Sequence, residues 1–268
     1  EEYERAVKNL PADRGAVIKL AQSFTQLAKY DLAIATYEKG ARLLADDGTF
    51  SYNLGELYRR QGDSPRMIES YLNSLRDNPG ILTSLQTIFQ RYFSNADFDE
   101  LQTQLYTRIQ EEEDAIFYVE LLGWVFIQRK DYANALRQVK SLDRRLKENG
   151  FRVFQFAETV ANDKYYDVAI DAYAYIITEK GPGTPIYVES KRQLLRCKRE
   201  KLVQDYVYTQ EELLQLEQEY LVFLDEFGRN RNTAPIILEL SELDAYYLND
   251  LEKAILLLQE MVAMPGIQ

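Results

Sequence analysis

Few side chains in this 268-residue sequence could carry out a reaction. There is no histidine, so the usual acid–base group and the commonest metal ligand are both missing. The one cysteine, Cys197, has no histidine to activate it, which favours a structural thiol over a nucleophile. No CxxC, P-loop or G-x-G-x-x-G motif occurs. The sequence therefore predicts neither an enzyme nor a cofactor site, and an enzyme or small-ligand receptor ranks behind the alternatives below.

An acidic run, Glu111-Glu112-Glu113-Asp114, could suggest a calcium site. It lacks the glycine-turned ligand spacing of a calcium-binding loop. Carboxylates are favourable near the positive end of a helix dipole. We therefore interpret the run as an acidic start to the helix that follows it, and we expect no metal.

A basic run covers Lys191–Lys201. Nucleic-acid and membrane surfaces interleave aromatic side chains with such charges, and none is present here. The neighbouring segment carries acids that could neutralise part of the run, namely Glu211, Glu212, Glu217 and Glu219. We interpret the run as a solvated, partly paired helix face, with an anionic partner as the alternative.

Composition limits the partners further. The formal net charge is −11, which disfavours general binding to nucleic acid or anionic lipid. No apolar run approaches the roughly 18 residues that span a bilayer. The sequence therefore predicts no nucleic-acid partner and no membrane insertion, and it leaves the oligomeric state open.

The elements that would position any binding residues are helical hairpins. In residues 14–47, two apolar-periodic stretches, Val17–Leu27 and Leu32–Leu44, each place apolar side chains on one helix face. Neither stretch is long enough to be stable alone in water, so each must pack on the other. Small residues at Ala21 and Ala33 would let the two backbones approach closely.

The hairpin pattern recurs at a shift of 34 residues. The triplet Leu20, Ala21 and Phe24 becomes Leu54, Gly55 and Tyr58, and the register continues without an insertion to about residue 183. Helix–turn–helix units of this period resemble the tetratricopeptide repeat family. The resemblance implies an all-α, right-handed superhelical solenoid. The third unit departs from the family pattern, because Phe89 and Leu101 stand where small residues are usual. Either its helices should splay or the superhelix should bend there.

The expected organisation is one solenoid over residues 1–268. Residues 1–13 are read as the end of an earlier repeat, which implies a further hairpin upstream. Gly181-Pro182-Gly183 should break the chain, and Thr184-Pro185 and Thr209 with Glu212 have the spacing of helix starts. The expected units are repeats at 14–47, 48–81, 82–115, 116–149 and 150–183, an elongated hairpin at 184–233 and a C-terminal hairpin at 234–268.

Resemblance also implies a partner-binding groove, because the first helix of each tetratricopeptide unit lines the concave surface. The implied contact residues are Tyr52, Glu56, Arg59, Gln90, Phe93, Phe117, Glu120, Trp124, Ile127, Phe151, Phe154 and Glu158. Members of the family that clamp a peptide's terminal carboxylates use Lys and Asn there, and Ile18, Tyr52 and Gln86 replace that set here. The alternative is that these aromatic side chains pack in the core.

Together these features predict a non-enzymatic scaffold that binds a protein or peptide, apolar with basic flanks, in its concave groove. The alternative is a structural spacer, or a subunit of a larger assembly whose groove is filled by segments of its own chain. The last part, Phe223–Asn230 and Leu243–Ile255, resembles repeat proteins of the Gram-negative cell envelope. This favours a periplasmic or envelope-associated location, with the cytoplasm as the alternative.

Overall fold

The computed structural model describes residues 1–46, 48–112, 114–204 and 208–266. Within these ranges the chain is all-α, as expected, with no β-strand. Backbone contacts divide it into two compact units, Glu1–Asp131 (unit 1) and Tyr132–Gln268 (unit 2), which are described separately. None of the helices in the described ranges is both long and apolar enough to span a bilayer.

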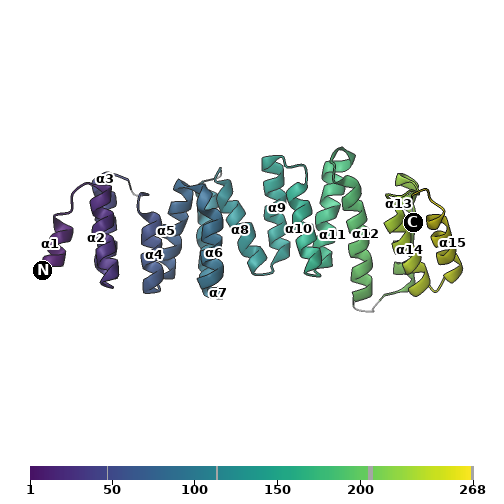
Figure 1. Ribbon diagram of the computed structural model, residues 1–268, viewed down its shortest axis with the longest axis horizontal. Helices are drawn as coiled ribbons and strands as arrows, with labels where there is room; N and C mark the ends of the chain where they lie inside the picture. Colours follow the sequence, from purple (N-terminus) through teal and green to yellow (C-terminus); the bar gives the residue numbers. More distant parts are fainter. Residues whose placement is uncertain (47, 113, 205–207, 267–268) are drawn as a thin grey trace. The chain divides into compact units, whose positions relative to one another are not determined.

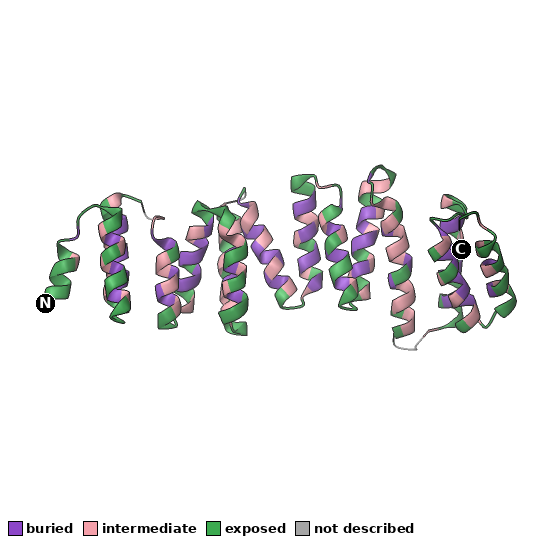
Figure 2. Ribbon diagram, viewed as in Figure 1, coloured by how far each residue is buried: buried purple, intermediate pink, exposed green. Residues whose placement is uncertain are grey.

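Unit 1 is a series of helices that pack on neighbours close in sequence (Figure 1). Its elements are α1 (Glu2–Lys8), α2 (Arg14–Gln26), α3 (Tyr30–Leu44), α4 (Ser51–Gln61), α5 (Ser64–Asp77), the 3-10 turn η1 (Pro79–Ile81), α6 (Leu82–Tyr92), α7 (Asn95–Glu111) and α8 (Ile116–Gln128). Side-chain caps fix several of the starts. Asp13 accepts a hydrogen bond from the Ala16 amide, and Asp63 accepts one from the Arg66 amide. In Figure 2, α1 is exposed almost throughout, whereas α2 carries a buried stripe.

Close approach within the first two hairpins depends on small residues. Ala21 and Ala33 are fully buried, as their spacing predicts. In the second hairpin, a Cβ atom added to Gly55 of α4 would lie 2.7 Å from the Tyr71 ring of α5. Glycine at this position therefore lets the tyrosine pack directly on the α4 backbone.

The third hairpin, α6 and α7, splays, which is one of the two outcomes expected from the sequence. Phe89 and Leu101 are both fully buried, and among the described residues the two helices lack the close backbone approach seen between α4 and α5. Helix α7 instead packs on α5 and α8. Large side chains at the two usual small positions have therefore moved the contacts of this hairpin to its neighbours.

Unit 2 continues in the same style. Its elements are α9 (Tyr132–Leu146), α10 (Phe151–Asn162), α11 (Tyr166–Tyr175), the π-helical turn η2 (Ile176–Lys180), the 3-10 turn η3 (Gly181–Gly183), α12 (Tyr187–Gln204), α13 (Gln210–Phe227), α14 (Ala234–Tyr246) and α15 (Leu251–Val262). The predicted start of α13 is confirmed, because Thr209 and Glu212 form a capping box. The predicted stop at Gly228 is also confirmed, since Gly228 is its C-terminal cap.

Two local predictions are wrong. Thr184 does not cap α12, because its hydroxyl donates to the Asn149 carbonyl oxygen at 2.9 Å and the helix begins at Tyr187. The acidic run does not open α8 either. Glu111 ends α7, Glu112 is its C-terminal cap, and the first turn of α8 has no acid. Glu113 lies outside the described residues.

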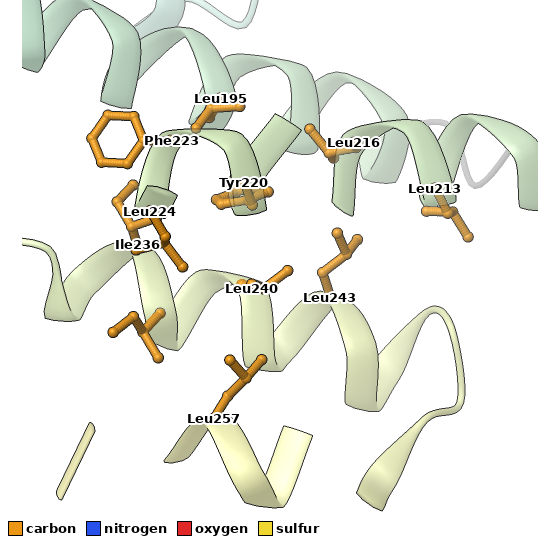
Figure 3. Packing of buried hydrophobic residues seen from close by; sticks show 11 residues of the cluster. Leu195, Leu213, Leu216, Tyr220, Phe223, Leu224, Ile236, Leu240, Leu243 and Leu257 are labelled. Atoms are coloured by element: carbon orange, nitrogen blue, oxygen red, sulfur yellow. The ribbon is translucent and has the colours of Figure 1, made fainter. Parts of the chain in front are cut away.

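The C-terminal helices share one apolar core (Figure 3). Its fully or nearly fully buried members come from α12 to α15: Leu195, Leu213, Leu216, Tyr220, Phe223, Leu224, Ile236, Ile237, Leu240, Leu243 and Leu257. Leu195 of α12 and Leu257 of α15 both contribute. The elongated hairpin and the last hairpin are therefore held together by continuous packing.

Candidate functional site

A row of six aromatic side chains runs through unit 1, from α4 to α8. Neighbouring ring centres in this aromatic row lie 5.7, 5.9, 4.4, 5.5 and 6.1 Å apart. These distances are those of favourable edge-to-face and tilted ring pairs. In order, the members are Tyr52, Tyr71, Phe89, Phe93, Phe98 and Trp124.

The middle of the aromatic row is buried and its other members are partly accessible. Tyr71 and Phe89 are fully buried, whereas Phe93, Phe98 and Trp124 are half-buried. Tyr52 keeps 39% of its surface exposed. The row therefore joins two buried core rings to aromatic side chains that remain partly accessible. Partner binding at the accessible positions stays a prediction.

Helix α4 places three expected contact residues on one face, since Tyr52, Glu56 and Arg59 follow at steps of four and three. The Arg59 Nη2 donates to Glu56 Oε2 at 2.8 Å, and the Tyr71 hydroxyl donates to the same carboxylate. Burial raises the pKa of Glu56, but hydrogen bonds from Arg59 and Tyr71 outweigh it and lower that pKa. Glu56 is therefore held ionised beside the row.

The Arg59 guanidinium also lies over the Tyr92 ring, 4.4 Å from its centre. Tyr92 is 51% exposed at the end of α6. Arginine stacked on an exposed tyrosine presents a flat surface with one cationic edge. Through Glu56, which both Arg59 and Tyr71 contact, this stacked arginine lies beside the aromatic row.

Of the residues expected in unit 1, Glu56 and Arg59 lie beside the aromatic row, and Tyr52, Phe93 and Trp124 are members of it, joined through intervening rings. Gln90 is exposed on α6, and Glu120 and Ile127 are half-buried on α8. Phe117 packs against Tyr118, with ring centres 4.5 Å apart. Sequence reasoning did not include Tyr92 and Phe98. Both are aromatic residues in the splayed third hairpin, where the repeat pattern no longer indicates which face a residue takes.

The remaining expected residues lie in unit 2. The Phe154 ring packs edge-on against Tyr173, with centres 5.6 Å apart. Phe151 is 47% exposed and borders an open cleft of about 440 Å³ with Arg152 and Gln155. Glu158 lines a mainly polar cleft of about 310 Å³ between α10, α11 and α12, opposite Arg196.

Cys197 also borders this polar cleft, but its side chain is buried. Burial raises the pKa of its thiol to about 11, so the thiolate is scarce at neutral pH. The interpretation as a structural thiol is therefore supported. Among the residues that the structure describes, no group of three or more Cys, Asp and Glu side chains could hold a metal ion.

The basic run on α12 is largely paired. Lys191 binds Glu226, Lys198 binds Glu219, and Arg199 binds Glu242. Of the four acids expected to neutralise the run, only Glu219 has an ion pair with it here. Glu212 caps its own helix, and Glu217 pairs with Lys253 of α15. A solvated and paired helix face accounts for the basic run.

Comparison with known proteins gives one family match. Residues 51–83, which cover α4, α5, η1 and the start of α6, match the family model of the tetratricopeptide repeat. No curated protein matches the sequence significantly.

Similar solved structures are repeat proteins of low identity. One is a tetratricopeptide repeat protein from Parabacteroides merdae, at 14% identity and a TM-score of 0.35, covering 94% of this chain and 93% of that one. Another is the C-terminal part of a TPR repeat-containing protein from Cytophaga hutchinsonii, at 14% identity and a TM-score of 0.40, with coverages of 93% and 96%. PilF of Pseudomonas aeruginosa is similar at 17% identity and a TM-score of 0.32, with coverages of 85% and 98%.

Proposed function

This chain carries a tetratricopeptide repeat, and on that premise we propose that it is a non-enzymatic scaffold that binds a partner polypeptide. The observation that carries the proposal is the aromatic row of unit 1. A row built only for stability would be buried throughout, whereas Tyr52 keeps 39% of its surface exposed and Phe93, Phe98 and Trp124 are half-buried. Accessible aromatic side chains fixed by buried neighbours are what binding hot spots require.

The partner segment that fits this surface is apolar with Lys or Arg beside it. The rings of Tyr52, Phe93 and Trp124 offer apolar contact. The ionised Glu56 and the net charge of −11 disfavour acidic segments and favour basic ones. Glu120 on α8 is another of the expected groove residues and adds a further carboxylate.

The residues of unit 2 belong to the proposal as a second contact region. Phe151 is exposed, Phe154 is fixed by Tyr173, and Glu158 borders the polar cleft of about 310 Å³. The division into repeats that underlies these assignments remains a prediction. A periplasmic or envelope location is likewise proposed from the resemblance of Phe223–Asn230 and Leu243–Ile255, and fractionation of cells that make the tagged protein would test it.

Site-specific photo-crosslinking in cells tests the proposed surface, whatever the identity of the partner. A benzophenone amino acid replaces Tyr52 in one variant and Tyr106 of α7 in the other, since the two tyrosines have similar exposures of 39% and 43%. We expect a crosslinked polypeptide from position 52 and none of that species from position 106. The same products from both positions would contradict the proposal. No crosslink at position 52 would favour the structural spacer.

A further inference from the structure

An apolar cavity of about 470 Å³ lies within unit 2, between α11 with η2, α12 and α13. None of the residues expected in the concave groove lines it. Its apolar walls come from six side chains: Ala174, Ile177, Leu194, Leu195, Val222 and Phe223. The volume is within the range of cavities that hold a drug-sized ligand or a few apolar side chains.

The local structure explains why this space is open. The chain after α11 widens into the π-helical turn η2, which contributes Ile177 and Thr178 to the wall. The end of η2 is fixed by Lys180, whose ammonium group pairs with the buried Asp143 carboxylate at 2.6 Å. On the opposite wall Val222 remains 53% exposed. The cavity therefore has one wall anchored by a buried ion pair and one apolar wall left in water.

Two ion pairs between α12 and α13 bracket the cavity. Lys191 binds Glu226 at 2.5 Å, and Lys198 binds Glu219 at 2.7 Å. The partners are seven residues apart on each helix, which is two turns or about 10 Å. The Lys191 side chain is 22% exposed and that of Glu226 is 39% exposed, so the carboxylate is the more accessible charge of that pair. In the second pair Lys198 and Glu219 are about equally exposed, at 33% and 30%, so Glu226 is the rim carboxylate most open to a partner.

We propose that this cavity binds an amphipathic helix of a partner protein, with apolar side chains one turn apart inside it and a Lys or Arg beside Glu226. Residues four apart on a helix lie side by side and fit an opening of two turns. The positive charge is favoured by the accessible Glu226 carboxylate and by the net charge of −11. This site does not depend on the aromatic row of unit 1.

A second copy of this chain is a weaker fit for the same cavity. Helix α15 does expose an apolar stripe, with Leu251 62%, Ile255 53% and Val262 68% exposed. The same helix carries Glu252 and Glu260, which would bring carboxylates toward Glu226. Charge therefore favours a basic helix over α15.

Model helices of known composition test the proposal on the whole chain. Two fluorescent peptides of about 18 residues, long enough to form a helix, carry leucine on one face and either lysine or glutamate on the other. Fluorescence anisotropy should show saturable binding of the lysine peptide and at least about tenfold weaker binding of the glutamate peptide. Equal affinities, or no saturable binding, would overturn the proposed chemistry.

A matched pair of variants locates the binding. Val222→Asp places a charge in the cavity wall, and Leu214→Asp places one on the same helix at a residue of similar exposure, 53% against 48%, outside the cavity lining. We expect at least about a tenfold loss of affinity for the lysine peptide in the first variant and less than about a twofold change in the second. Circular dichroism checks that both remain folded.

If Val222→Asp does not fold, Gln218→Lys at the exposed rim gives the same test, because added positive charge should weaken the lysine peptide several-fold. Equal losses in the cavity and control variants would place the binding elsewhere and overturn the proposal.

Sedimentation velocity tests whether a second copy of the chain fills the cavity. Self-association of the wild type that Val222→Asp abolishes would make a second copy the occupant and overturn the basic partner.

Discussion

The guanidinium of Arg59 lies 4.4 Å from the centre of the Tyr92 ring and donates at 2.8 Å to Glu56. A second arginine in the same hairpin has nearly the same local contacts. Arg66 pairs with Asp63 at 2.6 Å and lies 5.0 Å from the centre of the Tyr58 ring. The two arginines differ mainly in exposure, since the Arg59 side chain is 23% exposed and that of Arg66 is 61% exposed.

Arg59→Ala should therefore lower the free energy of unfolding by about 1 kcal/mol, because it removes a partly desolvated cation–π contact and leaves Glu56 with less compensation. Arg66→Ala should cause a smaller loss, since solvent screens its pair. Urea unfolding of both variants gives the comparison. Equal losses would mean that the ordered contact at Arg59 contributes no more than an ordinary surface pair.

A buried carboxylate in unit 2 gives the second prediction. Asp143 is fully buried and accepts hydrogen bonds from the Gly150 amide at 2.6 Å and the Tyr175 hydroxyl at 3.1 Å, besides its ion pair with Lys180. Asp143→Ala leaves all three donors without this partner and should cost on the order of 3–5 kcal/mol. Denaturant unfolding measures the loss. Asp143→Asn, which keeps an acceptor for Gly150, should lose less, and an equal loss would contradict this account.

The third prediction concerns pH. Asp244 is fully buried on α14, and neither carboxylate oxygen has a hydrogen-bond partner in the described part of the chain. Burial, and then the nearby charge of Asp250, raises its pKa from 3.8 to about 6. Because the folded pKa lies above the unfolded one, the contribution of Asp244 to stability is fully present below about pH 4. It falls as the pH rises from 4 to 6.

The difference in unfolding free energy between wild type and Asp244→Asn should consequently change by on the order of 2–3 kcal/mol between pH 4 and pH 7, in favour of the variant at pH 7. Urea unfolding at both pH values measures this difference. Asp225→Asn, at an exposed site on α13, is the control and should show no such change. A pH-independent difference for Asp244→Asn would mean that this carboxylate finds a partner.

Local signals in the sequence were the reliable ones. The capping box of Thr209 and Glu212 is specified within four residues, and it forms as predicted. Thr184 has an equally good local pattern, but its hydroxyl donates to Asn149, 35 residues away. The rotation of the helices likewise decides which acids face the α12 cations. Of the four expected acids only Glu219 pairs with the run, and Glu226 and Glu242 are partners that were not expected.

The candidate site also has a part that local sequence specifies and a part that tertiary packing decides. Tyr52, Glu56 and Arg59 follow from helical spacing within one element. Tyr92 and Phe98 join them only because the third hairpin splays and presents its aromatic residues to α4 and α8. The cavity of unit 2 could not be predicted, since the π-helical turn η2 that forms part of its wall has no signal in the repeat pattern.

Core packing gives the fourth prediction. Leu122 of α8 is 1% exposed, and Leu122→Ala should cost on the order of 2–5 kcal/mol through lost burial and a residual cavity. Leu43→Ala on α3, where the leucine is 41% exposed, should cost well under half as much. Thermal or urea unfolding decides, and a loss below about half a kcal/mol for Leu122→Ala would show that α8 repacks around the deletion.

The last prediction concerns the glycine beneath the aromatic row. A methyl group at Gly55 would lie 2.7 Å from two atoms of the Tyr71 ring, and Tyr71 itself packs against Tyr52 and Phe89. Gly55→Ala should raise helix propensity by about 1 kcal/mol, but the overpacking should cost about 1–3 kcal/mol, so a net loss of up to about 2 kcal/mol is expected. Near-ultraviolet circular dichroism should change as well, because the ring must move. Gly15→Ala, whose nearest atom is the flexible Asp13 carboxylate at 3.3 Å, is the control and should leave both readouts nearly unchanged. If Gly55→Ala stabilises the protein and leaves the aromatic spectrum intact, α4 and α5 can separate freely, and the row is not fixed by this contact.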